Sequence, residues 1–163
     1  MVRVKGKGVV EWVEDSAHLD GELKRLPKEK PTVLVVDDNK GTLKEIVKVL
    51  DDGERNIIAV GESGSAADIL YDRGAEIDLL VTDFRLRRGN DAGMQGDELC
   101  EIAKKVNPQI KTIMVSGDPG DARKGAVDKI IQKGSSDGES NLDSRVVKSI
   151  VKRVENPKYF GES

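Results

Sequence analysis

The chain has 163 residues, of which 37% are hydrophobic and 3% aromatic, enough for one domain whose core is packed mainly by aliphatic side chains. Its 27 Lys and Arg nearly balance 30 Asp and Glu, so charge gives no case for a nucleic-acid or anionic-membrane partner. The single cysteine, Cys100, excludes an intrachain disulfide. No signal peptide or apolar run of about 20 residues is present, and we expect a cytoplasmic protein.

The first thirty residues differ in pattern from the rest of the chain. Residues 9–13 fit an edge strand, and Leu19, Leu23 and Leu26 have helical spacing. Residues 27–31 are typical of a linker. Two interpretations stay open for this segment: a partly ordered appendage, or an element that docks on one edge of a sheet.

From residue 32 to about residue 133, strand-like apolar runs alternate with amphipathic stretches of helical spacing. This alternation predicts βα units and a parallel sheet. The predicted strands are 33–37, 56–60, 77–82, 110–115 and 130–133. Five helices are predicted. The first begins near residue 41 and the second begins at residue 63 or 65. The third carries the apolar residues of 99–106, the fourth occupies part of 118–124, and the fifth carries the apolar residues of 142–154.

Two of the predicted strands run directly into carboxylates. Residues 33–36 are followed by Asp37 and Asp38, and residues 79–82 are followed by Asp83. Ligands bind at the carboxyl ends of the strands in open α/β sheets, so we expect the three acids to converge there. Gathered carboxylates repel one another unless a cation lies among them, which favours a Mg²⁺ site. An alternative is that Asp37-Asp38-Asn39 forms only a polar turn that caps the next helix.

With Ser116 after the fourth predicted strand and Lys133 at the end of the fifth, this pattern resembles the receiver domain of two-component response regulators. The segments that carry the resemblance are Val33-Leu34-Val35-Val36-Asp37-Asp38-Asn39, Asp78-Leu79-Leu80-Val81-Thr82-Asp83, Val115-Ser116-Gly117 and Lys133. The resemblance implies a doubly wound five-stranded parallel sheet in the order 2-1-3-4-5, with helices on both faces. We expect residues 1–30 to form an extension, 31–156 the receiver domain and 157–163 a tail.

The resemblance also implies roles for the residues at the strand ends. Asp83 is the expected phosphoacceptor, and Ser116 and Lys133 contact the phosphoryl oxygens. Mg²⁺ is held by Asp38, Asp83 and the backbone carbonyl of Arg85, with Asp37 acting through a metal-bound water.

The implied partner is a histidine kinase or a phosphotransfer protein, and the downstream protein target is not identified by the sequence. We expect a stand-alone receiver that signals by protein contact or phosphoryl relay, with no nucleic-acid or membrane partner, and a homodimer stays open. Such a domain is not an enzyme beyond its own phosphorylation and dephosphorylation.

Three features depart from the family pattern. The loop 84–95 is about five residues longer, and either shapes kinase docking or is a neutral insertion. Residues 118–124 leave room only for a short fourth helix. Ile130 occupies the position of the aromatic switch residue, and Gly134 replaces the proline after Lys133. These changes alter the surface through which receivers signal.

Two rival functions follow from the same residues. A degenerate receiver would bind partners without being phosphorylated. A haloacid-dehalogenase-like phosphatase also uses Asp, Ser or Thr, and Lys with Mg²⁺, but it needs a second acid where this chain has Asn39.

Overall fold

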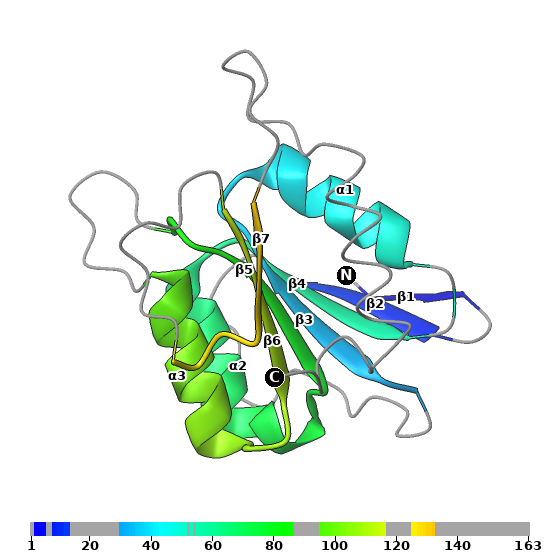
Figure 1. Cartoon of the computed structure of the whole chain (residues 1–163). Helices are drawn as coiled ribbons and strands as arrows, with labels where there is room; N and C mark the ends of the chain where they lie inside the picture. Colours follow the sequence, from blue (N-terminus) through cyan, green and yellow to red (C-terminus); the bar gives the residue numbers. More distant parts are fainter. Residues whose placement is uncertain are drawn as a thin grey trace, which may run out of the picture.

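A twisted sheet with helices on both faces forms the centre of the protein (Figure 1). The structure is a computed structural model that describes residues 2–5, 8–13, 30–51, 53, 55–86, 95–116 and 125–132. Within these residues the sheet has seven strands in the order β1-β2-β4-β3-β5-β6-β7. The strands are β1 (Val2–Lys5), β2 (Gly8–Val13), β3 (Thr32–Val36), β4 (Asn56–Val60), β5 (Leu79–Asp83), β6 (Lys111–Ser116) and β7 (Lys129–Gln132). The helices are α1 (Lys40–Leu50), α2 (Ser63–Arg73) and α3 (Gly96–Val106), with a 3-10 helix η2 (Gly74–Glu76) after α2.

The five predicted strands correspond to β3 to β7, and all four pairings among them are parallel. Their spatial order, β4-β3-β5-β6-β7, confirms the predicted order 2-1-3-4-5. The helices predicted over 118–124 and 142–154 lie outside the described residues. No helix in the described part of the chain has the length and apolar character needed to cross a membrane.

The N-terminal segment adds two strands to the five that the sequence predicts. β2 pairs in parallel with β4, with Val10 opposite Ile57 and Trp12 opposite Ala59, and β1 pairs antiparallel with β2. Val10 is 1% exposed, so the segment buries side chains as well as backbone. The docked interpretation is therefore correct for residues 2–5 and 8–13, and the appendage interpretation is wrong there. β4 is an inner strand rather than an edge.

The core consists of two apolar layers, one on each face of the sheet. Successive residues of a strand point to opposite faces, so Val33 and Val35 lie in one layer while Leu34 and Val36 lie in the other. α1 covers the first layer, and α2 and α3 cover the second (Figure 1). Burial on both faces explains why the central strands have continuous apolar sequences.

Cys100 packs in the second layer, on α3, and has no exposed surface. Burial raises the pKa of its thiol to about 12. At neutral pH the group is therefore a thiol rather than a reactive thiolate, and it acts as a small apolar side chain.

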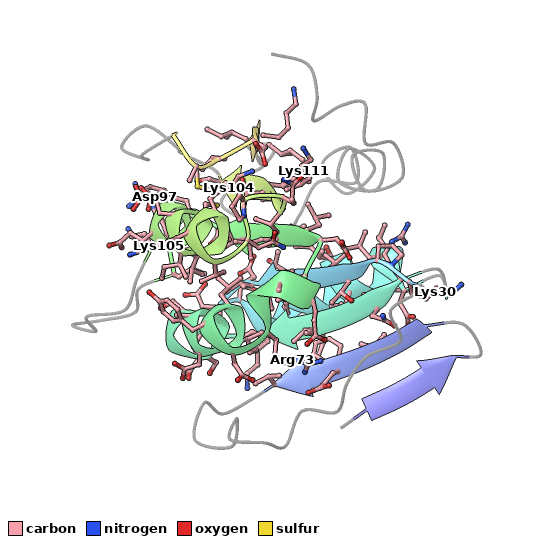
Figure 2. The ribbon with its side chains drawn as sticks, turned by 90° about the horizontal axis from the view of Figure 1, so that it is seen from below. Lys30, Arg73, Asp97, Lys104, Lys105 and Lys111 are labelled. Carbon is pink, nitrogen blue, oxygen red and sulfur yellow. The ribbon has the colours of Figure 1, made fainter. Side chains whose placement is uncertain are left out.

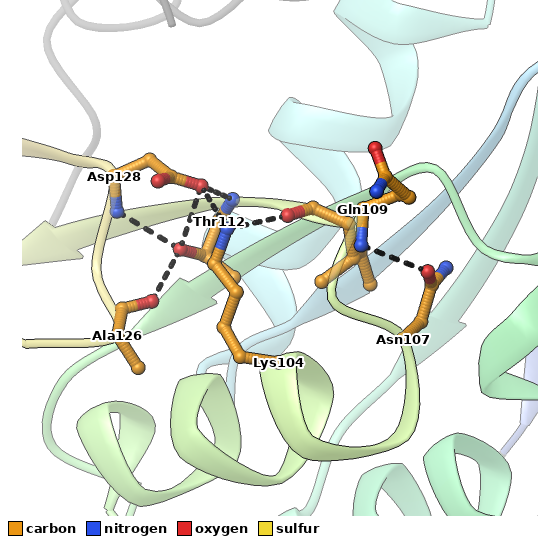
Figure 3. A network of polar contacts seen from close by, with 7 residues as sticks. Lys104, Asn107, Gln109, Thr112, Ala126 and Asp128 are labelled. Carbon is orange, nitrogen blue, oxygen red and sulfur yellow. Dashed lines mark hydrogen bonds and ion pairs between the residues drawn. The ribbon is translucent and has the colours of Figure 1, made fainter.

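A polar network at the amino end of β6 fixes how β7 joins the sheet (Figure 3). Asp128, immediately before β7, accepts hydrogen bonds at Oδ2 from Lys104 Nζ (2.8 Å) and from the backbone N–H of Thr112 (2.8 Å). The Thr112 hydroxyl donates to the carbonyl of Ala126 at 2.6 Å and accepts from the Asp128 N–H at 2.9 Å. Lys104 on α3 also donates to the carbonyl of Ile110. The network thus sets the β6–β7 register in which Ser116 lies opposite Gln132.

Glu11, in β2, has a buried carboxyl group near Arg73 at the end of α2. It is 5% exposed, and its Oε1 atom has no hydrogen-bond partner in the described structure. Burial raises the pKa of Glu11 above its ordinary value of 4.5, although the nearby guanidinium of Arg73 acts in the opposite direction. Arg73, at the end of α2, lies beside the N-terminal strands in Figure 2 and pairs with Glu76 at 3.6 Å.

Glu11→Gln is expected to strengthen the docking of β2 at pH 7, because Gln keeps the shape of the side chain without a buried charge. A carboxyl with a raised pKa in the folded state contributes its stability below pH 4.5 and loses it as the pH rises through the folded-state pKa. The midpoint of thermal unfolding of the variant should therefore rise relative to that of the wild type as the pH increases from 4 to 8. If the difference between the two midpoints were the same at every pH, ionisation of Glu11 would not affect the docking of β2.

Candidate functional site

The carboxyl ends of β3 and β5 bring three acidic side chains together. β3 pairs in parallel with β5, with Val36 opposite Thr82, so the following residues, Asp37 and Asp83, lie at the same level of the sheet. Asp37, Asp38 and Asp83 each offer a carboxylate oxygen, and these oxygens all lie within 4.8 Å of one another. The sequence predicted this convergence, and the structure shows it.

Hydrogen bonds at the end of β3 hold the acidic pair in place. The backbone N–H of Asp37 donates to the carbonyl of Val60 at 3.1 Å, which extends the β3–β4 ladder by one residue. Asp37 is 1% exposed, and its Oδ1 accepts the N–H of Asn39 at 2.8 Å. Asn39 caps α1, since its Oδ1 accepts the N–H of Thr42 at 2.9 Å. The turn therefore caps the helix through Asn39 and also directs Asp37 and Asp38 toward Asp83.

Gly96, the first residue of α3, sets the backbone of the other acid. Its N–H donates to the carbonyl of Phe84 at 2.8 Å. A Cβ atom at position 96 would overlap the carbonyl oxygen of Asp83, and it would lie 2.9 Å from the Asp83 carbonyl carbon. Only glycine allows α3 to begin this close to Asp83. Gly96 has only a weak signal in the sequence, because its place directly before an amphipathic stretch fits many helix starts.

The base of the predicted 84–95 insert is closed by contacts between its two ends. The side-chain oxygen of Gln95 accepts the N–H of Leu86 at 3.2 Å, and Leu86 is buried in the second core layer. Arg85 is exposed and lies over the ring of Phe84, 5.4 Å from its centroid. Residues 87–94 lie outside the described part of the chain, and the role of the Arg85 carbonyl as a metal ligand stays a prediction.

Ser116 lies at the same edge of the sheet as the acids. It is the last residue of β6 and is 2% exposed. Asp83 is opposite Val115, so Ser116 lies one residue beyond Asp83 on the neighbouring strand. Ile130 is half-buried in β7. Lys133 and Gly134 lie outside the described residues, so the predicted position of the Lys133 ammonium group stays a prediction.

The donor set fits a hard divalent cation. Carboxylate oxygens are the ligands that Mg²⁺ takes in proteins, at distances of about 2.1 Å, so two oxygens on opposite sides of one ion are about 4.2 Å apart. The observed limit of 4.8 Å is close to this spacing. Asp37, Asp38 and Asp83 are the described residues that would hold the ion.

Comparisons with known proteins identify the fold. No family model matches the sequence, and no curated protein matches it. Among solved structures, a response regulator receiver protein from Sinorhizobium medicae WSM419 aligns with a TM-score of 0.62 and 23% identity, over 79% of this chain and 94% of that one. A CheY-like response regulator receiver domain protein from Methanospirillum hungatei JF-1 aligns with a TM-score of 0.58 and 22% identity, over 80% of this chain and 94% of that one.

A third similar structure is of a complex that contains BeF3 and Mg²⁺. It is the CheX–CheY–BeF3–Mg²⁺ complex from Borrelia burgdorferi, which aligns with a TM-score of 0.59 and 19% identity, over 77% of this chain and 90% of that one. At these identities the likeness establishes the fold. The chain has the fold of response regulator receiver domains.

Proposed function

We propose that this chain is a receiver in which Asp83 accepts a phosphoryl group from a histidine kinase or a phosphotransfer protein, with Mg²⁺ bound by the acidic cluster. The observation that carries the proposal is the convergence of Asp37, Asp38 and Asp83 at the carboxyl ends of two adjacent strands of a receiver fold. A receiver core over residues 31–156 and a cytoplasmic location are parts of the same proposal.

In the proposed reaction, a carboxylate oxygen of Asp83 forms a bond to phosphorus while the bond from phosphorus to the donor's imidazole nitrogen breaks. The electron pair of the broken bond leaves with the nitrogen, and Asp83 becomes an acyl phosphate. Both reactants are anionic, so catalysis depends on positioning and charge compensation. A bound Mg²⁺ supplies positive charge against the phosphoryl oxygens.

The chain's own groups would complete the site. Asp38 and Asp83 hold the ion together with the carbonyl of Arg85, and Asp37 acts through a water. The Ser116 hydroxyl, one residue beyond Asp83 on β6, donates a hydrogen bond to a phosphoryl oxygen, and the Lys133 ammonium contacts another. Because Ser116 is buried at the end of β6, a contact from it to the phosphoryl group would shift that strand end and change the surface that a partner binds.

The proposal is tested by incubating the protein with acetyl phosphate and Mg²⁺ and measuring its intact mass. We expect one added phosphoryl group on the wild type, none after chelation of Mg²⁺, and none on Asp83→Asn, since the amide nitrogen and oxygen are poor nucleophiles. Asp68→Asn is the matched control, because Asp68 is exposed on α2 and the change removes the same charge. It should be phosphorylated like the wild type.

The rival functions give different results in the same assays. A wild type that gains no phosphoryl group under these conditions would favour a degenerate receiver that binds partners without phosphorylation. Continuous turnover of p-nitrophenyl phosphate, lost in Asp37→Asn, would favour a phosphatase. Modification that persists in Asp83→Asn would contradict the assignment of the phosphoacceptor.

A further inference from the structure

A cavity of about 500 Å³ lies between α1, the N-terminal strand β2 and the carboxyl end of β4. Its apolar wall includes Trp12 from β2, Ala59 from β4 and Leu43 from α1. Trp12 lies opposite Ala59 in the β2–β4 pairing, so the docked N-terminal strand supplies this aromatic wall. Asp38 lines the cavity and also belongs to the acidic cluster, so the cavity borders the proposed phosphorylation site.

Two lysines of α1 also line the cavity in positions that are unfavourable for the helix alone. Lys40 is the first residue of α1, where the helix dipole is positive, and the first turn holds no acid. Lys44 lies four residues later on the same face, where like charges repel. Among the described residues, no carboxylate forms an ion pair with either side chain. Both positions cost the helix some stability, which is expected where a function retains the charges.

The two acids of the cavity do not offset these lysines. Asp38 contributes its oxygen to the acidic cluster, which a cation would neutralise. Glu62 accepts a hydrogen bond from the Ser65 hydroxyl at 2.8 Å, and this contact directs the carboxylate toward the first turn of α2. With Mg²⁺ bound at the acidic cluster, as the proposed function requires, the charge that remains available to a molecule in the cavity is positive and lies on α1.

We propose that this cavity binds a small organic anion with a flat apolar body. The acidic group of the ligand lies between the ammonium groups of Lys40 and Lys44, and its flat body packs against Trp12. The volume is in the range of small-molecule sites, and the combination of an apolar wall with a few charged groups is typical of them. Asp83, the proposed phosphoacceptor, is not among the described residues that line the cavity.

Trp12 makes this proposal directly testable, because it is the only tryptophan of the chain. The probe is 8-anilinonaphthalene-1-sulfonate, an aromatic sulfonate of suitable size, titrated into the 163-residue chain in the presence of Mg²⁺. We expect saturable quenching of Trp12 emission together with a gain in probe emission. The double variant Lys40→Gln/Lys44→Gln should raise the Kd about tenfold or more, because two charge contacts are lost. Without the probe, this variant should melt slightly above the wild type.

Lys48→Gln is the matched control, since Lys48 is exposed on the next turn of α1 and does not line the cavity. Its Kd should match that of the wild type. Three outcomes would overturn the proposal: no saturable quenching, the same Kd in the double variant and in the Lys48 control, or a Trp12 that acrylamide cannot quench in the free protein. The last result would mean that the chain itself already fills the cavity.

Discussion

Mg²⁺ is expected to raise the midpoint of thermal unfolding of the wild type by about 5–10 °C when the free ion is present at about a hundred times its Kd. The reason is that the cation binds the folded state alone, since Asp37 and Asp38 follow β3 while Asp83 ends β5, and these residues meet only in the sheet. Asp38→Asn removes one ligand charge and is expected to lose most of this shift. Thermal unfolding in Mg²⁺ and in a chelator, measured by circular dichroism, gives the comparison.

Asp68→Asn serves as the control for the metal measurement as well, because it removes one negative charge from an exposed position of α2. It should show the full Mg²⁺ shift. If Asp38→Asn kept the full shift too, the ion would bind elsewhere and the proposed metal site would be wrong. This measurement does not use the phosphoryl group, so it separates a failure of metal binding from a failure of phosphorylation.

Gly96→Ala is expected to lower the free energy of unfolding by about 1–3 kcal/mol and to slow phosphorylation by acetyl phosphate. The new Cβ would overlap the carbonyl oxygen of Asp83 and lie 3.0 Å from the Cα of Phe84. These are backbone atoms, so a rotamer change cannot relieve the contact and either α3 or the end of β5 must move. Chemical denaturation measures the first effect, and the rate of phosphoryl incorporation in Mg²⁺ measures the second.

Gly64→Ala is the control for this substitution. Gly64 is exposed in α2, and a Cβ there meets no atom within 4 Å. Alanine favours the helix over glycine by up to about 1 kcal/mol, so this variant should be slightly more stable and phosphorylated at the wild-type rate. Equal behaviour of the two variants would show that the start of α3 does not constrain Asp83.

Most of the central sheet was predictable because its sequence signals are local. The predicted strand 56–60 agrees with β4, and 33–37 is shifted by one residue from β3. Strands buried on both faces require continuous apolar runs, and these are visible without any knowledge of their partners. The docking of β2 could not be decided in this way, because residues 9–13 look like a strand while their partner, β4, is distant in sequence. Pairing across such a distance leaves no local mark.

For the candidate site, the sequence alone determined which acids lie together, because the carboxyl ends of parallel strands share one edge of a sheet whatever the details of packing. Only the tertiary structure decided the contacts around them. The closeness of Gly96 to Asp83, the cavity beside Trp12 and the Asp128–Thr112–Lys104 network each join segments far apart in the chain. Strand periodicity specifies which side of the sheet a residue faces. These distances depend instead on how helices and loops pack against the sheet, and no single segment encodes that packing.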